Sequence, residues 1–197
     1  DQTDEETERY DQPVLIRLNT RDEIELRSGF PISAEDLYGY EGIIIDDMEA
    51  EFFSPDQLML MQRYVSERGG GFLMLGGADS LENGRYLRTP VGDMLPVYLD
   101  RLPNALVATE YKLDLTREGW LHPWIRLRAT ENEERNRLDA IPGYQVLNQL
   151  REVKPGATVL ATASDALGNR YPAIASQRFG NGRVGVVALG DLFLGGM

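Results

Sequence analysis

The sequence predicts an α/β fold, a mainly parallel, doubly wound sheet with an antiparallel C-terminal portion. The apolar run at 42–48 is followed by a helical stretch at 54–69 and a second apolar run at 71–77. That order predicts a right-handed β-α-β unit with buried parallel strands. The last third of the chain is rich in strand-forming residues, and turn sequences such as "FGNGR" there predict hairpins.

The first elements follow from local signals. The stretches "VLIRLN" at 14–19 and "EIEL" at 23–26 alternate enough to predict short strands. Ser33 with Asp36 predicts a helix start. A serine oxygen can accept from the backbone N–H groups of the first turn, and an acid suits the positive end of a helix.

The helix at 54–69 has the clearest start and stop signals. Ser54 is the expected cap, Pro55 takes the first helical position, and Gly69 ends the helix. The spacing places four side chains on one buried face: Leu58, Met61, Tyr64 and Val65. Downstream we expect helices within 84–95 and 131–141, extended segments at 96–100 and 111–116, a loop at 118–127, and strands at 157–164, 171–179 and 183–191.

Length and charge limit the possible functions. The chain has 197 residues and 42% hydrophobic residues, enough for one α/β domain with a sizeable core. We expect an acidic, flexible lead-in at 1–12 and a single domain at 13–197, a fragment of a larger protein. A net charge of −12 disfavours nucleic acid and anionic membrane surfaces as partners. No apolar run reaches the roughly 20 residues of a membrane span, so we expect no direct membrane insertion.

Over roughly residues 24–191, the order of several stretches resembles a known family. The most specific stretch is "YVSERGGGFLMLGG" at 64–77, and "LTREGWLHPWIRL", "VKPGATVLATA" and "FGNGRVGVVALGD" follow it. They resemble the class I glutamine amidotransferase-like domain of bacterial membrane proteins, which often accompanies von Willebrand factor A-type regions. The resemblance implies a flavodoxin-like sheet and an extracytoplasmic, periplasmic position in a membrane-anchored parent.

The catalytic residues of true amidotransferases are missing. Those enzymes carry a Gly-x-Cys-x-Gly turn, but here the corresponding residues are Gly76, Gly77, Ala78, Asp79 and Ser80. The chain has no cysteine, and no histidine or glutamate follows Ser164. Glutamine hydrolysis through a Cys-His-Glu triad is therefore excluded. The remaining catalytic candidates are Ser80 as nucleophile and His122, the single histidine, as its base. The alternative is that Ser80 caps a helix and His122 has a structural role.

Acids follow several predicted strands and suggest a second kind of site. Asp46 and Asp47 end one strand, Asp79 follows the next, and Asp191 ends the last. Ligands of open parallel sheets bind at the carboxyl ends of the strands, and converging carboxylates could hold Ca²⁺ or Mg²⁺. The alternative is that these acids are solvated or cap helices. Gly77, Asp79 and Ser80 are the predicted ligand-binding residues. An aromatic shelf of Trp120, Trp124 and Tyr144 is a further possibility, with packing as the default.

Together these observations predict a non-catalytic, degenerate amidotransferase-like domain that acts as a binding or assembly module. No cofactor is expected. The expected partner is another protein or another domain of the parent chain. The alternative is an enzyme, either a hydrolase using Ser80 with His122 or a metal-dependent activity at the acidic edge.

Overall fold

The structure is a computed structural model that describes residues 16, 18, 29–100 and 108–192. The predicted lead-in at 1–12 and the predicted strand at 23–26 lie outside these ranges, as does the strand at 14–19 except for two single residues.

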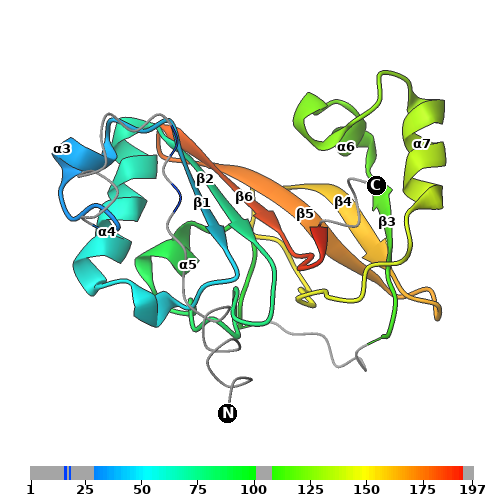
Figure 1. Ribbon diagram of the computed structural model, residues 1–197, viewed down its shortest axis with the longest axis horizontal. Helices are drawn as coiled ribbons and strands as arrows, with labels where there is room; N and C mark the ends of the chain where they lie inside the picture. The colour runs from blue at the N-terminus through cyan, green and yellow to red at the C-terminus, as the bar shows by residue number, and fades with distance from the viewer. Residues whose placement is uncertain (1–15, 17, 19–28, 101–107, 193–197) are drawn as a thin grey trace, which may run out of the picture.

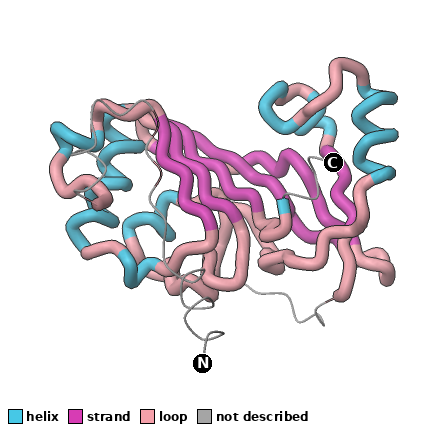
Figure 2. Tube along the Cα trace, viewed as in Figure 1, coloured by secondary structure: helices cyan, strands magenta, loops and turns pink. Residues whose placement is uncertain are grey.

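Six strands form one sheet in the described part of the chain. They are β1 (Gly42–Asp46), β2 (Gly71–Leu75), β3 (Lys112–Leu115), β4 (Thr158–Ser164), β5 (Arg170–Phe179) and β6 (Gly182–Val187). Their order across the sheet is β1-β2-β6-β5-β4-β3. The β1–β2 and β2–β6 pairs are parallel, whereas β6–β5, β5–β4 and β4–β3 are antiparallel. Figure 2 shows the strands as one continuous twisted layer.

The predicted fold class is wrong in its main feature. The sheet is mixed, and most of its pairings are antiparallel, so it is not a doubly wound, helix-flanked sheet of the flavodoxin-like or amidotransferase-like kind. The physical reason lies in the connections. Parallel pairing needs a long crossover, which 42–75 supplies, whereas the short "FGNGR" turn joins β5 and β6 as an antiparallel hairpin.

The helices are short and gather at opposite ends of the sheet. They are α3 (Ala34–Leu37), α4 (Pro55–Arg63), α5 (Pro90–Met94), α6 (Arg117–Trp120) and α7 (Glu131–Ala140), with a π-helical turn at Tyr64–Arg68 and 3-10 turns at Ala50–Phe52 and Pro123–Ile125. Helices α3 to α5 lie beside β1 and β2, whereas α6 and α7 lie near β3 (Figure 1).

The predicted start and stop of the long helix are confirmed. The Ser54 hydroxyl accepts from the Gln57 N–H at 3.2 Å, and the Gln57 side chain accepts from the Ser54 N–H at 3.0 Å. This reciprocal pair is a capping box, with Pro55 in the first turn. Gly69 ends the helical segment with a φ of 89°, a left-handed conformation that favours glycine.

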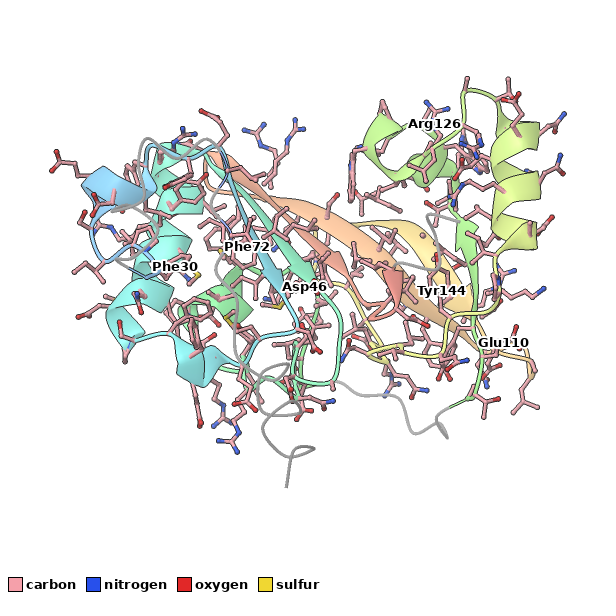
Figure 3. The ribbon with its side chains drawn as sticks, in the orientation of Figure 1. Phe30, Asp46, Phe72, Glu110, Arg126 and Tyr144 are labelled. Atoms are coloured by element: carbon pink, nitrogen blue, oxygen red, sulfur yellow. The ribbon has the colours of Figure 1, made fainter. Side chains whose placement is uncertain are left out.

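The core lies between α4, α5 and one face of the sheet. Ile43 and Ile45 on β1 are buried, and Phe72 (Figure 3) and Met74 on β2 share the same core. The intervening Ile44 is 68% exposed. The run at 42–48 was predicted to be buried on both faces. Instead β1 alternates, because no helix of the described chain covers its second face.

Candidate functional site

The predicted ligand-binding turn lies at the carboxyl end of β2 and is held by its own hydrogen bonds. The Gly77 N–H donates to Asn148 Oδ1, and Asn148 Nδ2 donates to the Gly77 carbonyl, both at 2.9 Å. The Asp79 N–H donates to Asp47 Oδ1 at 2.7 Å. The structure therefore brings Asp47, Gly77 and Asp79 together, with the backbone N–H of Asp79 and not its carboxylate making the contact.

Glycine at position 77 has a steric reason. A Cβ built on Gly77 would lie 2.0 Å from Asp47 Oδ1 and 2.1 Å from its Cγ, so the carboxylate takes the space of a side chain. Asp47 itself has a φ of 44°, a conformation in which aspartate is enriched. These contacts give the turn a structural role. Its ligand-binding role stays a prediction.

Ser80 and His122 do not form a catalytic pair in the structure. The Ser80 side chain is fully buried, and its hydroxyl donates to the Leu75 carbonyl at 2.5 Å. His122 lies on a different part of the molecule, in the wall of a hollow described below. Ser80 is followed by a turn and not by a helix, so the alternative prediction that it caps a helix is wrong as well.

The strand-end acids form no metal centre within the described residues. No group of three or more His, Cys, Asp or Glu side chains there could hold an ion. Asp46 ends β1 (Figure 3), and partial burial, followed by the adjacent Asp47 carboxylate, raises its pKa. Asp191 is 7% exposed, and its Oδ2 accepts from the Gln145 N–H at 2.7 Å, whereas its Oδ1 has no hydrogen-bond partner among the described residues.

A hollow of about 560 Å³ lies on the sheet face that α4 does not cover. We call this the open-face hollow. Its floor is formed by neighbouring residues of three strands, Gly42 and Ile44 on β1, Gly71 and Leu73 on β2, and Gly185 on β6. The glycines keep the floor flat around the two apolar side chains.

The walls of the open-face hollow come from the antiparallel half of the molecule. Thr158 on β4 and Ser176 on β5 are registered neighbours that each bring a hydroxyl group to the lining. His122 and Trp124 line it from the segment after α6, and Trp124 is 51% exposed. Of the three aromatic residues predicted as a shelf, Trp124 alone lines the hollow. Tyr144 is buried, and Trp120 lies under the Arg135 guanidinium, 5.4 Å from its ring centroid.

A buried ion pair holds the wall segment in place. Glu134 on α7 is fully buried, and its Oε2 accepts from the N–H groups of Leu127 at 3.1 Å and Arg128 at 2.9 Å. Its Oε1 accepts from Arg137. Burial alone would raise the pKa of Glu134, but the hydrogen bonds from Arg137 and the two N–H groups hold that pKa below its usual value. The chain after Trp124 is thereby tied to α7.

Sequence reasoning missed most of the open-face hollow. Ile44 and Leu73 sit in apolar runs that predict burial, so no sequence signal indicated that Ile44 is exposed and Leu73 only partly buried. Arg178 and Arg183 also line the hollow and face each other across β5 and β6. They flank the "FGNG" turn, so hairpin geometry offered a signal that they would be neighbours.

The comparisons with known proteins found similar folds among solved structures. No protein-family model matches the chain, and no curated protein matches its sequence. Among solved structures, the cytoplasmic protein STM3548 from Salmonella typhimurium is similar with a TM-score of 0.64 and 19% identity, over 84% of this chain and 70% of that one. The cytoplasmic protein STM1381 from Salmonella typhimurium LT2 has a TM-score of 0.58 and 24% identity over the same shares.

A β-galactosidase from Bacillus circulans sp. alkalophilus is also similar, with a TM-score of 0.50 and 19% identity over 81% of this chain. The match covers 22% of that enzyme's length. At these identities the likeness concerns the arrangement of strands and helices and carries no activity with it.

The comparisons also correct the predicted location and class. The two Salmonella neighbours are named as cytoplasmic proteins, which contradicts the predicted periplasmic, membrane-associated position. None of the helices in 29–100 and 108–192 is long and apolar enough to cross a bilayer. None of these neighbours is named as an amidotransferase-like domain. With no matching family model, the family resemblance itself stays a prediction.

Proposed function

We propose that this chain is a non-catalytic binding or assembly module that takes its ligand in the open-face hollow. The observation that carries the proposal is the hollow itself, about 560 Å³, whose floor over β1, β2 and β6 is not covered by a helix of the described chain. Ligand sites in proteins commonly have volumes of about 300–1,000 Å³ and a mostly apolar lining with a few polar groups. The Ile44, Leu73, Thr158 and Ser176 side chains fit that description.

Exposed apolar surface supports a binding role. Ile44 is 68% exposed and Trp124 is 51% exposed, and they line one hollow from two distant parts of the sequence. Removing apolar surface from water contributes about 25 cal/mol per Å², so a ligand that covers both side chains gains affinity without rearranging the core. The carboxyl edge offers less, because Gly77, Asp79 and Ser80 already form internal hydrogen bonds.

The candidate catalytic residues support a non-catalytic role. A serine nucleophile needs a base within hydrogen-bond reach and access to substrate. Ser80 is fully buried and donates to a backbone carbonyl, and His122 lies in the hollow.

Mapping of fragment binding by NMR tests the proposal. We would screen a library of small neutral and charged fragments against the ¹⁵N-labelled chain and locate each hit by its amide shifts. We expect hits to shift the amide resonances of Ile44, Leu73 and Gly185. Gly185→Leu should abolish them by filling the floor, since the nearest atom to a Cβ there is the flexible end of Leu73 at 3.0 Å.

Asp79→Ala is the matched control at the other end of the sheet, and it should leave the hits unchanged. Hits that shift the amide resonances of residues 77–80 and disappear in Asp79→Ala would refute the hollow as the binding site. They would support a site at the carboxyl edge instead. A screen without hits on either surface would refute a small-ligand site in this domain.

A further inference from the structure

Two arginines at the rim of the open-face hollow form an unusual pair. Arg178 on β5 and Arg183 on β6 are registered partners of an antiparallel pair and line the same hollow. Gln177 projects to the other side of β5, where its amide donates to the Met94 carbonyl at 2.9 Å. Residues directly opposite each other on one face of a sheet have Cβ atoms about 4.5–5.5 Å apart. The two arginine side chains therefore start from neighbouring positions on one face of the sheet.

The two arginine side chains have no internal partner. Within the described residues neither forms an ion pair or a side-chain hydrogen bond, whereas Arg63, Arg68 and Arg135 all pair with glutamates. Like charges directly opposite each other destabilise a sheet. The chain has 32 acidic and 20 basic residues, yet none of the described residues that line this hollow is acidic. The hollow is thus a positive site on a strongly negative protein.

We infer that the open-face hollow binds a small organic anion, with a phosphate or carboxylate group on the Arg178–Arg183 pair and an apolar, planar body on the floor beside Trp124. This inference rests on the proposed function. Two guanidinium groups present parallel N–H donors that suit an oxyanion, and an anion between them removes their repulsion. The Thr158 and Ser176 hydroxyls can orient the ligand, and the glycine floor accepts a flat group.

Tryptophan fluorescence offers a direct test. The chain has two tryptophans, and Trp124 alone lines the hollow. Titration with phenyl phosphate should quench emission saturably with a Kd of about 1 mM or tighter, as expected for a fragment of that size. Trp124→Phe should lose the quenching, because Trp120 packs against Arg135 instead. Raising the salt from 50 to 500 mM should weaken binding.

Charge variants decide between ligand classes. Arg178→Gln with Arg183→Gln should weaken phenyl phosphate binding about tenfold or more. Arg170→Gln, which removes one positive charge at the other end of β5, should change it less than twofold. Benzyl alcohol, a neutral counterpart, should bind at least tenfold more weakly than phenyl phosphate.

Three results would overturn the inference. If benzyl alcohol binds as well as phenyl phosphate and the double variant binds both normally, the hollow binds ligands but does not select anions, and the proposed function survives. If tetraglutamate binds at least as tightly as phenyl phosphate, the ligand is an acidic segment of a protein. If no probe alters Trp124 emission, and the fragment screen gives no hits either, the inference and the proposed function fail together.

Discussion

Replacing Glu134 by glutamine should destabilise the protein and loosen the wall of the open-face hollow. The carboxylate is fully buried and accepts from Arg137 and from the N–H groups of Leu127 and Arg128. Glutamine keeps the shape and one acceptor oxygen, but its NH₂ group must face a donor, and Arg137, with an 11% exposed side chain, loses its counter-charge.

Breaking a buried ion pair from one side costs about 3–5 kcal/mol. The residual exposure of Arg137 and the acceptor oxygen that glutamine retains reduce this cost. We therefore expect the free energy of unfolding to fall by about 2–3 kcal/mol at pH 7. For a domain of this size the loss corresponds to a Tm lower by about 4–12 °C. Urea unfolding followed by circular dichroism measures it. Glu131→Gln is the matched control on the same helix, since its exposed pair with Arg135 contributes less than about 0.5 kcal/mol.

The pH dependence separates charge from shape in this substitution. The folded-state pKa of Glu134 is lowered, so its contribution to stability is present above the unfolded-state pKa, near 4.5, and is lost as the pH falls through the lower folded value. The difference in the free energy of unfolding between wild type and Glu134→Gln should therefore shrink below pH 4.5. Equal stabilities at pH 7, or a difference that stays constant down to pH 3, would refute the role assigned to this carboxylate.

Three further predictions follow from burial and packing. Ile43→Ala should cost about 2–4 kcal/mol and Ile44→Ala less than about 1 kcal/mol in urea unfolding, because adjacent side chains of β1 are 7% and 68% exposed. Gly70→Ala should cost about 1–3 kcal/mol, since its methyl group would lie 2.1 Å from the buried ring of Tyr64. Millimolar Ca²⁺, Mg²⁺ or Zn²⁺ should shift the Tm by less than about 1 °C, and a larger rise that Asp79→Ala abolishes would establish a metal site at the acidic edge.

Local structure could be predicted from the sequence because its causes are local. Ser54, Pro55 and Gly69 mark the ends of one helical segment, and each acts within a few residues of its own position. The hairpin between β5 and β6 likewise follows from the glycines and asparagine of one short turn. Such signals place elements along the chain without stating which strands become neighbours.

The predicted fold class was wrong because local sequence signals do not determine which strands become neighbours in a sheet. One clear β-α-β unit suggested a parallel sheet, and the family resemblance extended that pattern to the whole domain. The antiparallel pairing of β4 with β3 joins residues far apart in the sequence, such as Leu115 and Ala161. Similarly, the three consecutive isoleucines of β1 predict burial on both faces, but exposure of Ile44 depends on whether another segment covers it.

The site prediction pointed to the strand-end residues and missed most of the open-face hollow. Polar residues at strand ends stand out in a sequence, and the structure does bring Asp47, Gly77 and Asp79 together. The Asp47 carboxylate and the Gly77 backbone groups already have partners within the protein, which makes the turn rigid and leaves the exposed Asp79 side chain for a ligand. Arg178 and Arg183 differ, since the described chain holds them side by side without counter-charges. A binding surface is better recognised by interactions that folding leaves unmade, and those become visible only when the neighbours of each side chain are known.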